Sequence, residues 1–309
     1  MRDRGPEIVV VGSANLDLVV SVRHHPAPGE TVLGGDLQRI PGGKGANQAT
    51  AASRLGRRTA FVGAVGADDA GHALQQSLTS AGVDTSHLVV APDVPTGTAL
   101  IAVADDGDNT IVVSPGANRT VDRDLIATAQ PLISATPVLL LQLEIPGEAV
   151  TAAAEAATGM VVCNPAPAPA RPLPASLLEA VDVLVPNETE LTALTRSDPT
   201  SSLDDLAAAA ATLGMPAVVV TLGALGALLV TPDHQQRFPA PVIEPVDTTA
   251  AGDSFCAALA DHLVEDPGDL PGAVEWAVRV GAATTLRRGA APSLPTRDEV
   301  EHRLAGLRP

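Results

Sequence analysis

Short apolar runs alternate with longer windows of helical periodicity along most of the chain. The runs that predict strands lie at residues 8–11, 60–65, 138–143, 160–163, 183–185 and 217–222. Helical windows follow most of them, and those at 44–55 and 251–264 are the clearest. The alternation predicts an α/β fold in one domain, 1–309, with a mostly parallel central sheet covered by helices on both faces.

Two other pairs of segments are strand-like but have a different pattern. Residues 18–22 precede 31–37, and residues 98–104 precede 110–114; these segments alternate in polarity or are rich in Thr and Val. The turn-forming stretches PAPGE and DDGDN separate the members of each pair, which predicts antiparallel hairpins outside the main sheet. The small lid predicted in this way comprises residues of about 16–40 and 96–115.

The composition of the 309 residues narrows the range of possible partners. The formal net charge is −17, which argues against a nucleic-acid partner. With three Phe, one Trp and no Tyr, the chain is poorly equipped to stack a planar ligand between rings. No apolar span reaches the length of about 18 residues typical of a membrane helix, and the N-terminal segment lacks a signal-peptide pattern, so we expect a soluble cytoplasmic protein. Cys163 and Cys256 form neither a disulfide framework nor a zinc-binding spacing.

The stretch PGGKGANQA, residues 41–49, is the first candidate for a binding loop. Consecutive glycines let a backbone approach a ligand closely, and the helix that follows offers free N–H groups and the positive end of its dipole. Lys44 and Asn47 lie about one turn apart at that end, which suits a polyhydroxy or anionic ligand. The spacing is not that of a Walker P-loop, and such a loop alone is more often a tight turn.

Polar residues also follow the ends of predicted strands. Asn15 and Asp17 come after the first strand, where open α/β sheets bind ligands, although an Asx turn would explain them as well. Glu144 ends an apolar strand, where a carboxylate is costly unless it is paired or faces a cavity. Asn187 and Glu190 fit a capping box, and the helix start that they mark could also hold a phosphate or a hydrated metal ion.

The stretch TAAGDSF combines an anion site with a carboxylate. Ala250, Ala251 and Gly252 begin a predicted helix whose unpaired N–H groups would cradle the charge that develops in phosphoryl transfer. Asp253 follows in the first turn, where it could accept a proton from an attacking hydroxyl or simply stabilise the helix dipole by about 0.3–1 kcal/mol. Asp247 is a turn residue or a cation ligand. This pairing favours kinase chemistry.

Taken together, these motifs resemble the ribokinase-like family of carbohydrate kinases. The resemblance runs from VVVGSANLDLVV through PGGKGANQA, LLQLEIP, NPAPA, VPNETE and VDTTAAGDSFCAAL to RRGAAPSLP, and GGKGANQA and DTTAAGDSF are its most specific parts. It implies a three-layer α/β fold with a small β-strand lid. It also implies ATP-dependent phosphorylation of the 5-hydroxyl of D-ribose, which gives D-ribose 5-phosphate.

The resemblance implies a role for each candidate residue. Asp253 would be the catalytic base, with the amides of Ala250, Ala251 and Gly252 as the anion hole. The residues on the sugar would be Asn15, Asp17, Gly43, Lys44, Asn47, Glu144 and Asp253. Those on the ATP and Mg²⁺ side would be Asn187, Glu190, Thr221, Gly223, Gly226 and Gly252. A monovalent cation, normally K⁺, would bind near Asp247, Thr249, Thr284, Arg287, Gly289 and Ser293.

Two departures from the family pattern concern the phosphoryl donor. Ala224 and Leu225 stand where relatives often carry a polar or basic pair, and Val278 stands where a His or Asn tends to lie near adenine. The alternatives are a deoxyribokinase, another pentose or nucleoside kinase, and a non-catalytic sugar-binding protein. The scarcity of aromatic residues argues against a nucleoside, and the intact Asp253 argues against a non-catalytic protein. Because exposed lid strands need covering, we expect a homodimer formed through the lid.

Overall fold

The computed structural model describes residues 5–197 and 202–306, so the first residues of the N-terminal segment lie outside the described range. Its main sheet has the order β13-β12-β11-β10-β9-β8-β1-β4-β5. In that order the strands are Gln235–Phe238, Ala227–Val230, Ala217–Thr221, Val183–Leu184, Met160–Asn164, Val138–Gln142, Ile8–Val11, Thr59–Gly66 and Asp84–Ala91. Pairing is parallel from β11 to β5 and antiparallel between β11, β12 and β13.

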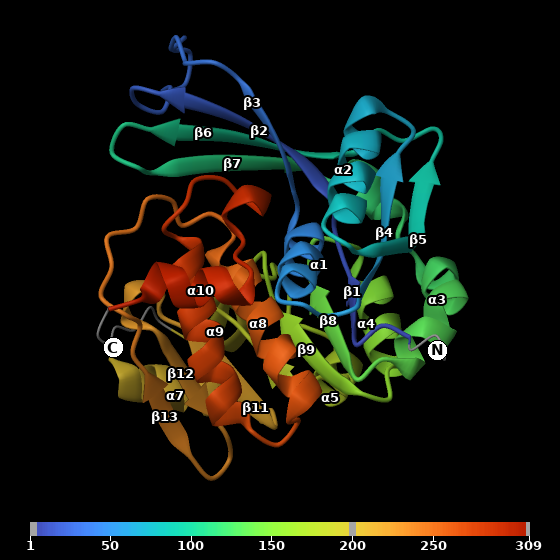
Figure 1. Ribbon diagram of the computed structural model, residues 1–309, viewed down its shortest axis with the longest axis vertical. Coiled ribbons are helices and arrows are strands. Elements are labelled where there is room, and N and C mark those ends of the chain that lie inside the picture. Colours follow the sequence, from blue (N-terminus) through green and yellow to red (C-terminus); the bar gives the residue numbers. More distant parts are fainter. Residues whose placement is uncertain (1–4, 198–201, 307–309) are drawn as a thin grey trace.

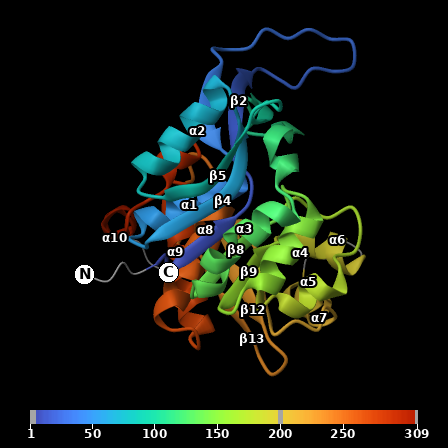
Figure 2. The same ribbon diagram turned by 90° about the vertical axis from the view of Figure 1, so that its right-hand side faces the viewer.

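Helices cover both faces of this sheet (Figure 2). On one face lie α1 (Lys44–Arg54), α2 (Asp69–Ser80), α8 (Ala251–Glu265), α9 (Leu270–Thr284) and α10 (Arg297–Leu304). On the other lie α3 (Arg123–Ala135), α4 (Gly147–Ala156), α5 (Ala175–Ala180), α6 (Glu188–Thr195) and α7 (Leu203–Ala211). Ile8 and Val10 of β1 pack into one apolar core and Val9 and Val11 into the other, because successive side chains of a strand point to opposite faces. The three-layer architecture follows from this alternation, as predicted.

A second, smaller sheet forms the lid. Its order is β3-β2-β6-β7, with strands Gln38–Gly42, Asn15–Val22, Gly97–Ala104 and Asn109–Ser114. In Figure 1 it lies apart from the main sheet, above the helices α8, α9 and α10. Strands β6 and β7 form the predicted antiparallel hairpin, and β2 pairs with β6 in parallel. This parallel pairing joins the two lid segments into one sheet.

The predicted strand at 31–37 is wrong. The segment contains no strand, and β2 pairs instead with β3, which begins at Gln38. Leu33 is 93% exposed, so this apolar residue has no face to pack against. The glycines at 34 and 35 interrupt the alternation, and glycine weakens a strand because it has no side chain to pack.

No helix in the described part of the chain has the length and apolar character that crossing a bilayer requires. The fold instead brings the carboxyl ends of several parallel strands to one edge of the main sheet. Helices α1 and α8 both begin at this edge, and the lid strand β2 starts there four residues after β1 ends. Strand ends, helix starts and the base of the lid therefore meet in one region, as expected for a ligand site in an open α/β sheet.

Candidate active site

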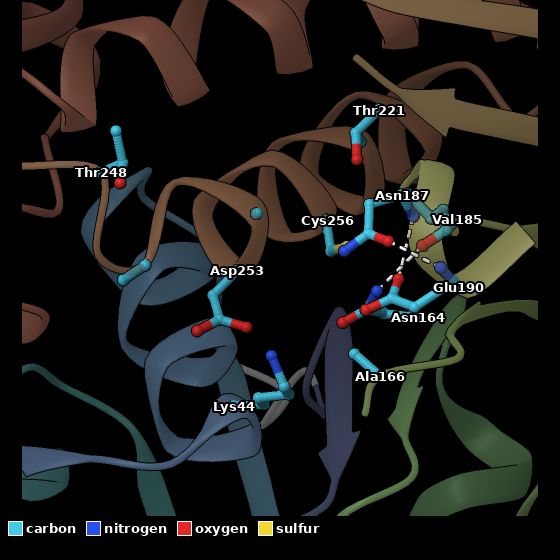
Figure 3. A pocket seen from close by; sticks show the side chains of 12 residues that line it. Lys44, Asn164, Ala166, Val185, Asn187, Glu190, Thr221, Thr248, Asp253 and Cys256 are labelled. Atoms are coloured by element: carbon cyan, nitrogen blue, oxygen red, sulfur yellow. Dashed lines mark hydrogen bonds between the residues drawn. The ribbon is translucent and has the colours of Figure 1, made fainter. Parts of the chain in front are cut away.

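A pocket of about 250 Å³ lies where these strand ends meet the helix starts (Figure 3). The residues that line it are Lys44, Asn164, Ala166, Val185, Asn187, Glu190, Thr221, Thr248, Ala250, Gly252, Asp253 and Cys256. Lys44 begins α1, Asp253 lies in the first turn of α8, and Glu190 lies in the first turn of α6. The structure thus brings together residues from four of the sequence motifs, although they are far apart in the chain.

The start of α8 has an uncommon backbone conformation and no side-chain cap. Its N-cap, Ala250, has a left-handed backbone with a φ of 61°, and no side chain caps the helix. Such a conformation costs an alanine about 1–2 kcal/mol and is typical of functional sites. Ala250 and Gly252 line the pocket, whereas the amide of Ala251 donates to the carbonyl of Thr248 over 3.3 Å.

Asp253 is one of two buried carboxylates among the described residues that line this pocket, the other being Glu190, and each has 7% of its surface exposed. Its Oδ2 accepts a hydrogen bond from Asn47 Nδ2 (2.9 Å), and its Oδ1 accepts one from Gln48 Nε2 (3.3 Å). Burial raises the pKa of Asp253, while Lys44 and the two amides act in the opposite direction. Asn47, predicted to bind the sugar, therefore contacts the predicted base. Gln48 was missed, although its helical spacing of four from Lys44 could have indicated it.

Lys44 is the cation of the site. Burial disfavours its ammonium, but the nearby carboxylates, chiefly Asp253 and Glu144, outweigh that effect and raise the pKa of Lys44. Glu144 follows β8 and accepts hydrogen bonds from Ser13 Oγ (2.5 Å) and from the backbone N–H of Lys44 (3.2 Å). The carboxylate is therefore paired, as the sequence required of one at the end of an apolar strand.

Asp17 faces the same group of charges from the base of the lid. It is 9% exposed, and burial, with added repulsion from Glu144 and Asp253, raises its pKa to about 7 against the opposing effect of Lys44. A Cβ on Gly42 would lie 2.2 Å from Asp17 Oδ2, so the neighbouring strand must carry glycine at this point. The carboxylate needs hydrogen-bond donors, and hydroxyl groups could supply them.

Asn15 is held in place by a residue that the sequence analysis missed. Asn118 Nδ2 donates to Asn15 Oδ1 (2.7 Å), and Asn118 Oδ1 accepts from the backbone N–H of Ala14 (2.9 Å). Gly43, the N-cap of α1, has a φ of 87°, and a Cβ there would lie 2.6 Å from the backbone nitrogen of Asn15. Both the conformation and the close approach therefore demand glycine.

Asn187 and Glu190 form the capping box that their spacing predicts, with reciprocal bonds of 2.8 and 2.9 Å. They also line the pocket, as does Thr221 at the end of β11. Burial raises the pKa of Glu190, although the backbone N–H of Asn187 opposes this. Asn164, which was not among the candidates, lies beside Glu190 in Figure 3 and donates to the carbonyl of Val185 over 2.8 Å. This wall offers amide and carboxylate oxygens.

Gly223 and Gly226 form the turn after β11, with φ values of 56° and 98°. A Cβ on Gly226 would lie 1.9 Å from the carbonyl oxygen of Phe238, so close backbone packing already explains this glycine. A Cβ on Gly223 would meet open space. Neither glycine is among the described residues that line the pocket, and their contact with a nucleotide stays a prediction.

Asp247 connects the loop before α8 with the loop after α9. Its Oδ1 accepts from the N–H of Thr249 (2.9 Å) and its Oδ2 from the N–H of Gly289 (2.8 Å). Burial opposes ionisation, but these bonds outweigh it and lower the pKa of Asp247. Thr284 donates to Ser254 Oγ (2.8 Å), which ties the end of α9 to the start of α8. The two loops thus support the start of α8.

Two further residues that were predicted to lie near the monovalent cation contact charged side chains of α10. Arg303 Nη1 donates to the carbonyl of Ser293 (2.7 Å), and Arg287 forms an ion pair with Glu299 at 3.2 Å. Within residues 5–197 and 202–306, no group of three or more His, Cys, Asp or Glu side chains could hold a metal ion. A cation here would have to rely on Asp247 and on backbone carbonyls, the ligand type typical of K⁺ sites.

Comparisons with known proteins agree with this geometry. A family model described as pfkB family carbohydrate kinase matches residues 6–297. The ribokinase of Bacillus subtilis is 38% identical, over 96% of this chain and 99% of that protein. The deoxyribokinase of Salmonella typhi is 34% identical, over 97% and 99%. The structure of Arabidopsis thaliana ribokinase complexed with ribose and ATP superposes with a TM-score of 0.89 at 33% identity, over 97% of this chain and 99% of that one. The predicted ribokinase-like fold is therefore confirmed.

Proposed function

The chain belongs to the pfkB family of carbohydrate kinases, and within that family we propose that it transfers the γ-phosphoryl group of ATP to the 5-hydroxyl of D-ribose. The observation that carries the proposal is Asp253, a buried carboxylate at an uncapped helix start that faces Lys44 across the pocket. The products are D-ribose 5-phosphate and ADP. The similarity to ribokinases over nearly the whole chain supports this choice of substrate.

In the proposed reaction Asp253 accepts the proton of the attacking 5-hydroxyl. A bond forms between that oxygen and the γ-phosphorus, and the bond from phosphorus to the bridging oxygen of ADP breaks. The free N–H groups at the start of α8 stabilise the charge that develops on the transferred group, because they are oriented before the reaction begins. Lys44 favours the ionised form of Asp253, the form that can act as a base.

The acceptor is oriented by the polar groups below the lid. Asp17 can accept hydrogen bonds from two neighbouring hydroxyls, which we assign to the 2- and 3-hydroxyls of ribose. Asn15, Gly43, Lys44 and Glu144 complete the proposed sugar site. Since Asn118 already occupies Asn15 Oδ1, the amide nitrogen of Asn15 is the group left for the sugar.

Mg²⁺ fits the wall formed by Asn164, Asn187 and Glu190, since this ion prefers oxygen ligands and is usually bound by one or two carboxylates together with substrate phosphates. Mg²⁺ bound there would neutralise charge on the phosphates of ATP. K⁺ fits the loops that Asp247 joins, and we assign its site to these loops. Gly223 and Gly226 are proposed to lie along the nucleotide, next to Thr221.

We also propose that the protein is a homodimer that pairs through its lids. Strand β7 is exposed along its whole length, with Val112 60% exposed, and Leu100 of β6 is exposed beside it. An exposed apolar edge of this kind needs covering. Analytical ultracentrifugation would test the dimer.

Because the reaction consumes ATP, we expect the protein to lie in the cytoplasm, which cell fractionation would check.

A deoxyribokinase is the second candidate, because the relative with that activity is almost as similar to this chain as the ribokinase is. Measuring ADP release with ATP and a panel of ribose, 2-deoxyribose, other pentoses and nucleosides would decide between them. The proposal expects the highest kcat/KM with ribose. A preference for 2-deoxyribose or a nucleoside would overturn it, and binding of ribose without ADP release would indicate a non-catalytic protein.

A further inference from the structure

Two neighbouring side chains of α1 reach across to the carboxylate of Asp253 on α8. Asn47 donates to one carboxylate oxygen and Gln48 to the other, at 2.9 and 3.3 Å. Gln48 has no solvent exposure, so it touches neither water nor the pocket surface. Its amide group is therefore used entirely inside the protein, and Asp253 is one of the two groups that it contacts.

The second group is Gln142, the last residue of β8, which is also fully buried. Gln142 Nε2 donates to Gln48 Oε1 over 2.6 Å. A Cβ on Gly12 would lie 1.9 Å from Gln142 Oε1, so the glycine at the end of β1 makes room for this amide. Gln142, Gln48 and Asp253 thus form a continuous chain of hydrogen bonds from the central sheet to the carboxylate.

The donor and acceptor at each of these hydrogen bonds follow from the chemistry of the three side chains. An ionised carboxylate only accepts hydrogen bonds, so Gln48 must present its NH₂ group to Asp253. Its carbonyl oxygen then faces Gln142, which must donate. Gln142 Oε1 is buried and has no hydrogen-bond partner among the described residues, a costly arrangement for a purely structural amide. This series of hydrogen bonds leaves Gln142 Oε1 unpaired, but it orients the NH₂ group of Gln48 as a donor to Asp253.

We propose that Gln48 and Gln142 are positioning residues for the base of the reaction, Gln48 by holding one oxygen of Asp253 and Gln142 by fixing the amide orientation of Gln48. The inference rests on the proposed function only in naming Asp253 as the base. With one amide donor on each oxygen, the carboxylate cannot rotate freely. Its remaining lone pairs stay available for the proton of the substrate hydroxyl.

The other charged and titratable groups near Asp253 come from several elements. They are Asp17 of β2, Lys44 of α1, Glu144 after β8, Glu190 of α6 and Cys256 of α8. Lys44 is the cation among them, three are carboxyl groups, and Cys256 is a thiol whose pKa is raised by burial. Burial raises the pKa of Asp253, so the hydrogen bonds from Asn47 and Gln48, which lower it, help to keep the base ionised.

The decisive variant is Gln48→Met, which keeps the side-chain length and removes the donor. The acid limb of kcat against pH, where Asp253 becomes protonated, should move upward by about one pH unit, since a hydrogen bond to a charged group is lost. Binding of ribose, measured by calorimetry, should change less than about threefold, because Gln48 does not face the pocket. A merely structural role would lower kcat or stability without moving the acid limb.

The matched control is Ser53→Ala, which removes a hydrogen bond at the other end of α1, from Ser53 Oγ to the carbonyl of Ala81 (2.7 Å). Its acid limb should stay at the wild-type pH. Gln142→Met should move the acid limb in the same direction as Gln48→Met but less far, because Gln48 then loses only its orienting partner. If Gln48→Met does not fold, Gln142→Met alone carries the test.

A second measurement separates this inference from the proposed function. The pKa of Asp253 can be followed by the ¹³C shift of its carboxyl group in labelled protein without substrate, with Asp253→Asn identifying the signal. Gln48→Met should raise that pKa whichever sugar the enzyme uses. A folded variant with an unchanged acid limb and an unchanged Asp253 pKa would overturn the positioning role, whereas absence of ribose-dependent ADP release by the wild type would overturn the function alone.

Discussion

The two sides of Asp253 are built in different ways. On the side of the phosphoryl acceptor, Asn15, Asp17 and Asn47 are buried, and polar side chains from strands and helix starts converge. On the side of the phosphoryl donor, three of the candidate residues are the glycines at 223, 226 and 252, and Leu225 in the turn after β11 is 57% exposed. Side chains therefore build the proposed sugar site and the wall of Asn164, Asn187 and Glu190, whereas backbone groups and open loops build the rest of the proposed nucleotide site and the proposed K⁺ site.

The difference has an electrostatic consequence. The acceptor side gathers Asp17, Glu144 and Asp253 around Lys44, and the pKa of Asp17 is raised to about 7 by burial and by its acidic neighbours. These carboxylates provide more hydrogen-bond acceptors than donors, and the hydroxyl groups of a ligand would supply the missing donors. On the donor side Asp247 is instead satisfied by backbone amides, and its pKa is lowered. A polyhydroxy ligand would therefore complete the proposed sugar site, while the loops of the proposed cation site are already joined by Asp247.

The largest effect is expected at the junction of the two sides. Asp253→Asn keeps the size of the residue and one of the two acceptor oxygens but removes the base, so turnover should fall by at least ~100-fold, while ribose binding stays largely intact. Steady-state kinetics and calorimetry would measure the two effects separately. Unchanged turnover would contradict the assignment of Asp253 as base.

The next effect tests the acceptor side through its ligand. We expect 2-deoxyribose to be poorer than ribose by at least ~10-fold in kcat/KM, because one hydroxyl fewer leaves a buried acceptor unpaired. Asp17→Ala should weaken the binding of ribose more than the binding of 2-deoxyribose, since only ribose uses both carboxylate oxygens of Asp17. Equal kcat/KM values for the two sugars in the unmodified enzyme would favour the deoxyribokinase alternative.

The raised pKa of Asp17 predicts that ribose binding depends on pH. Hydroxyl donors stabilise the ionised carboxylate, so ribose should bind better as the pH rises through about 7. Lowering the pH from about 7.5 to about 6.0 should weaken binding by about eightfold, the ratio of ionised fractions for such a group. Calorimetric titrations would measure this. Asp17→Asn should show a flat profile, and an equally steep profile in that variant would assign the effect to another group.

The smallest effect tests the donor side. Because the proposed cation acts on the shape of the helix start, through the loops that Asp247 joins, and does not touch the phosphate, K⁺ should raise activity by about fivefold over Na⁺ or Li⁺ at equal ionic strength. Asp247→Ala should reduce this preference. If the enzyme is exhaustively exchanged into K⁺-free buffer and is then as active as in K⁺, the result would count against a cation site.

The sequence revealed most of the main sheet because its central strands are buried on both faces and read as continuous apolar runs. It missed β5, in which half of the residues are polar, β13, which is mostly polar and exposed, and β12, which follows a glycine motif. It placed a strand at 31–37 because a short alternating pattern does not show whether a packing surface exists. Edge strands depend on their neighbours, and those neighbours are distant in sequence.

The candidate site shows the same division. Motifs such as PGGKGANQA and TAAGDSF determine local features by themselves, because a left-handed N-cap or a free helix start depends on a few adjacent residues. Only the tertiary structure decided that Gln48 and Asn47 contact Asp253, more than 200 positions away. It also decided that Asn118 holds Asn15 and that burial raises the pKa of Asp17 to about 7. Partners and burial arise from packing between elements, which local chemistry alone cannot specify.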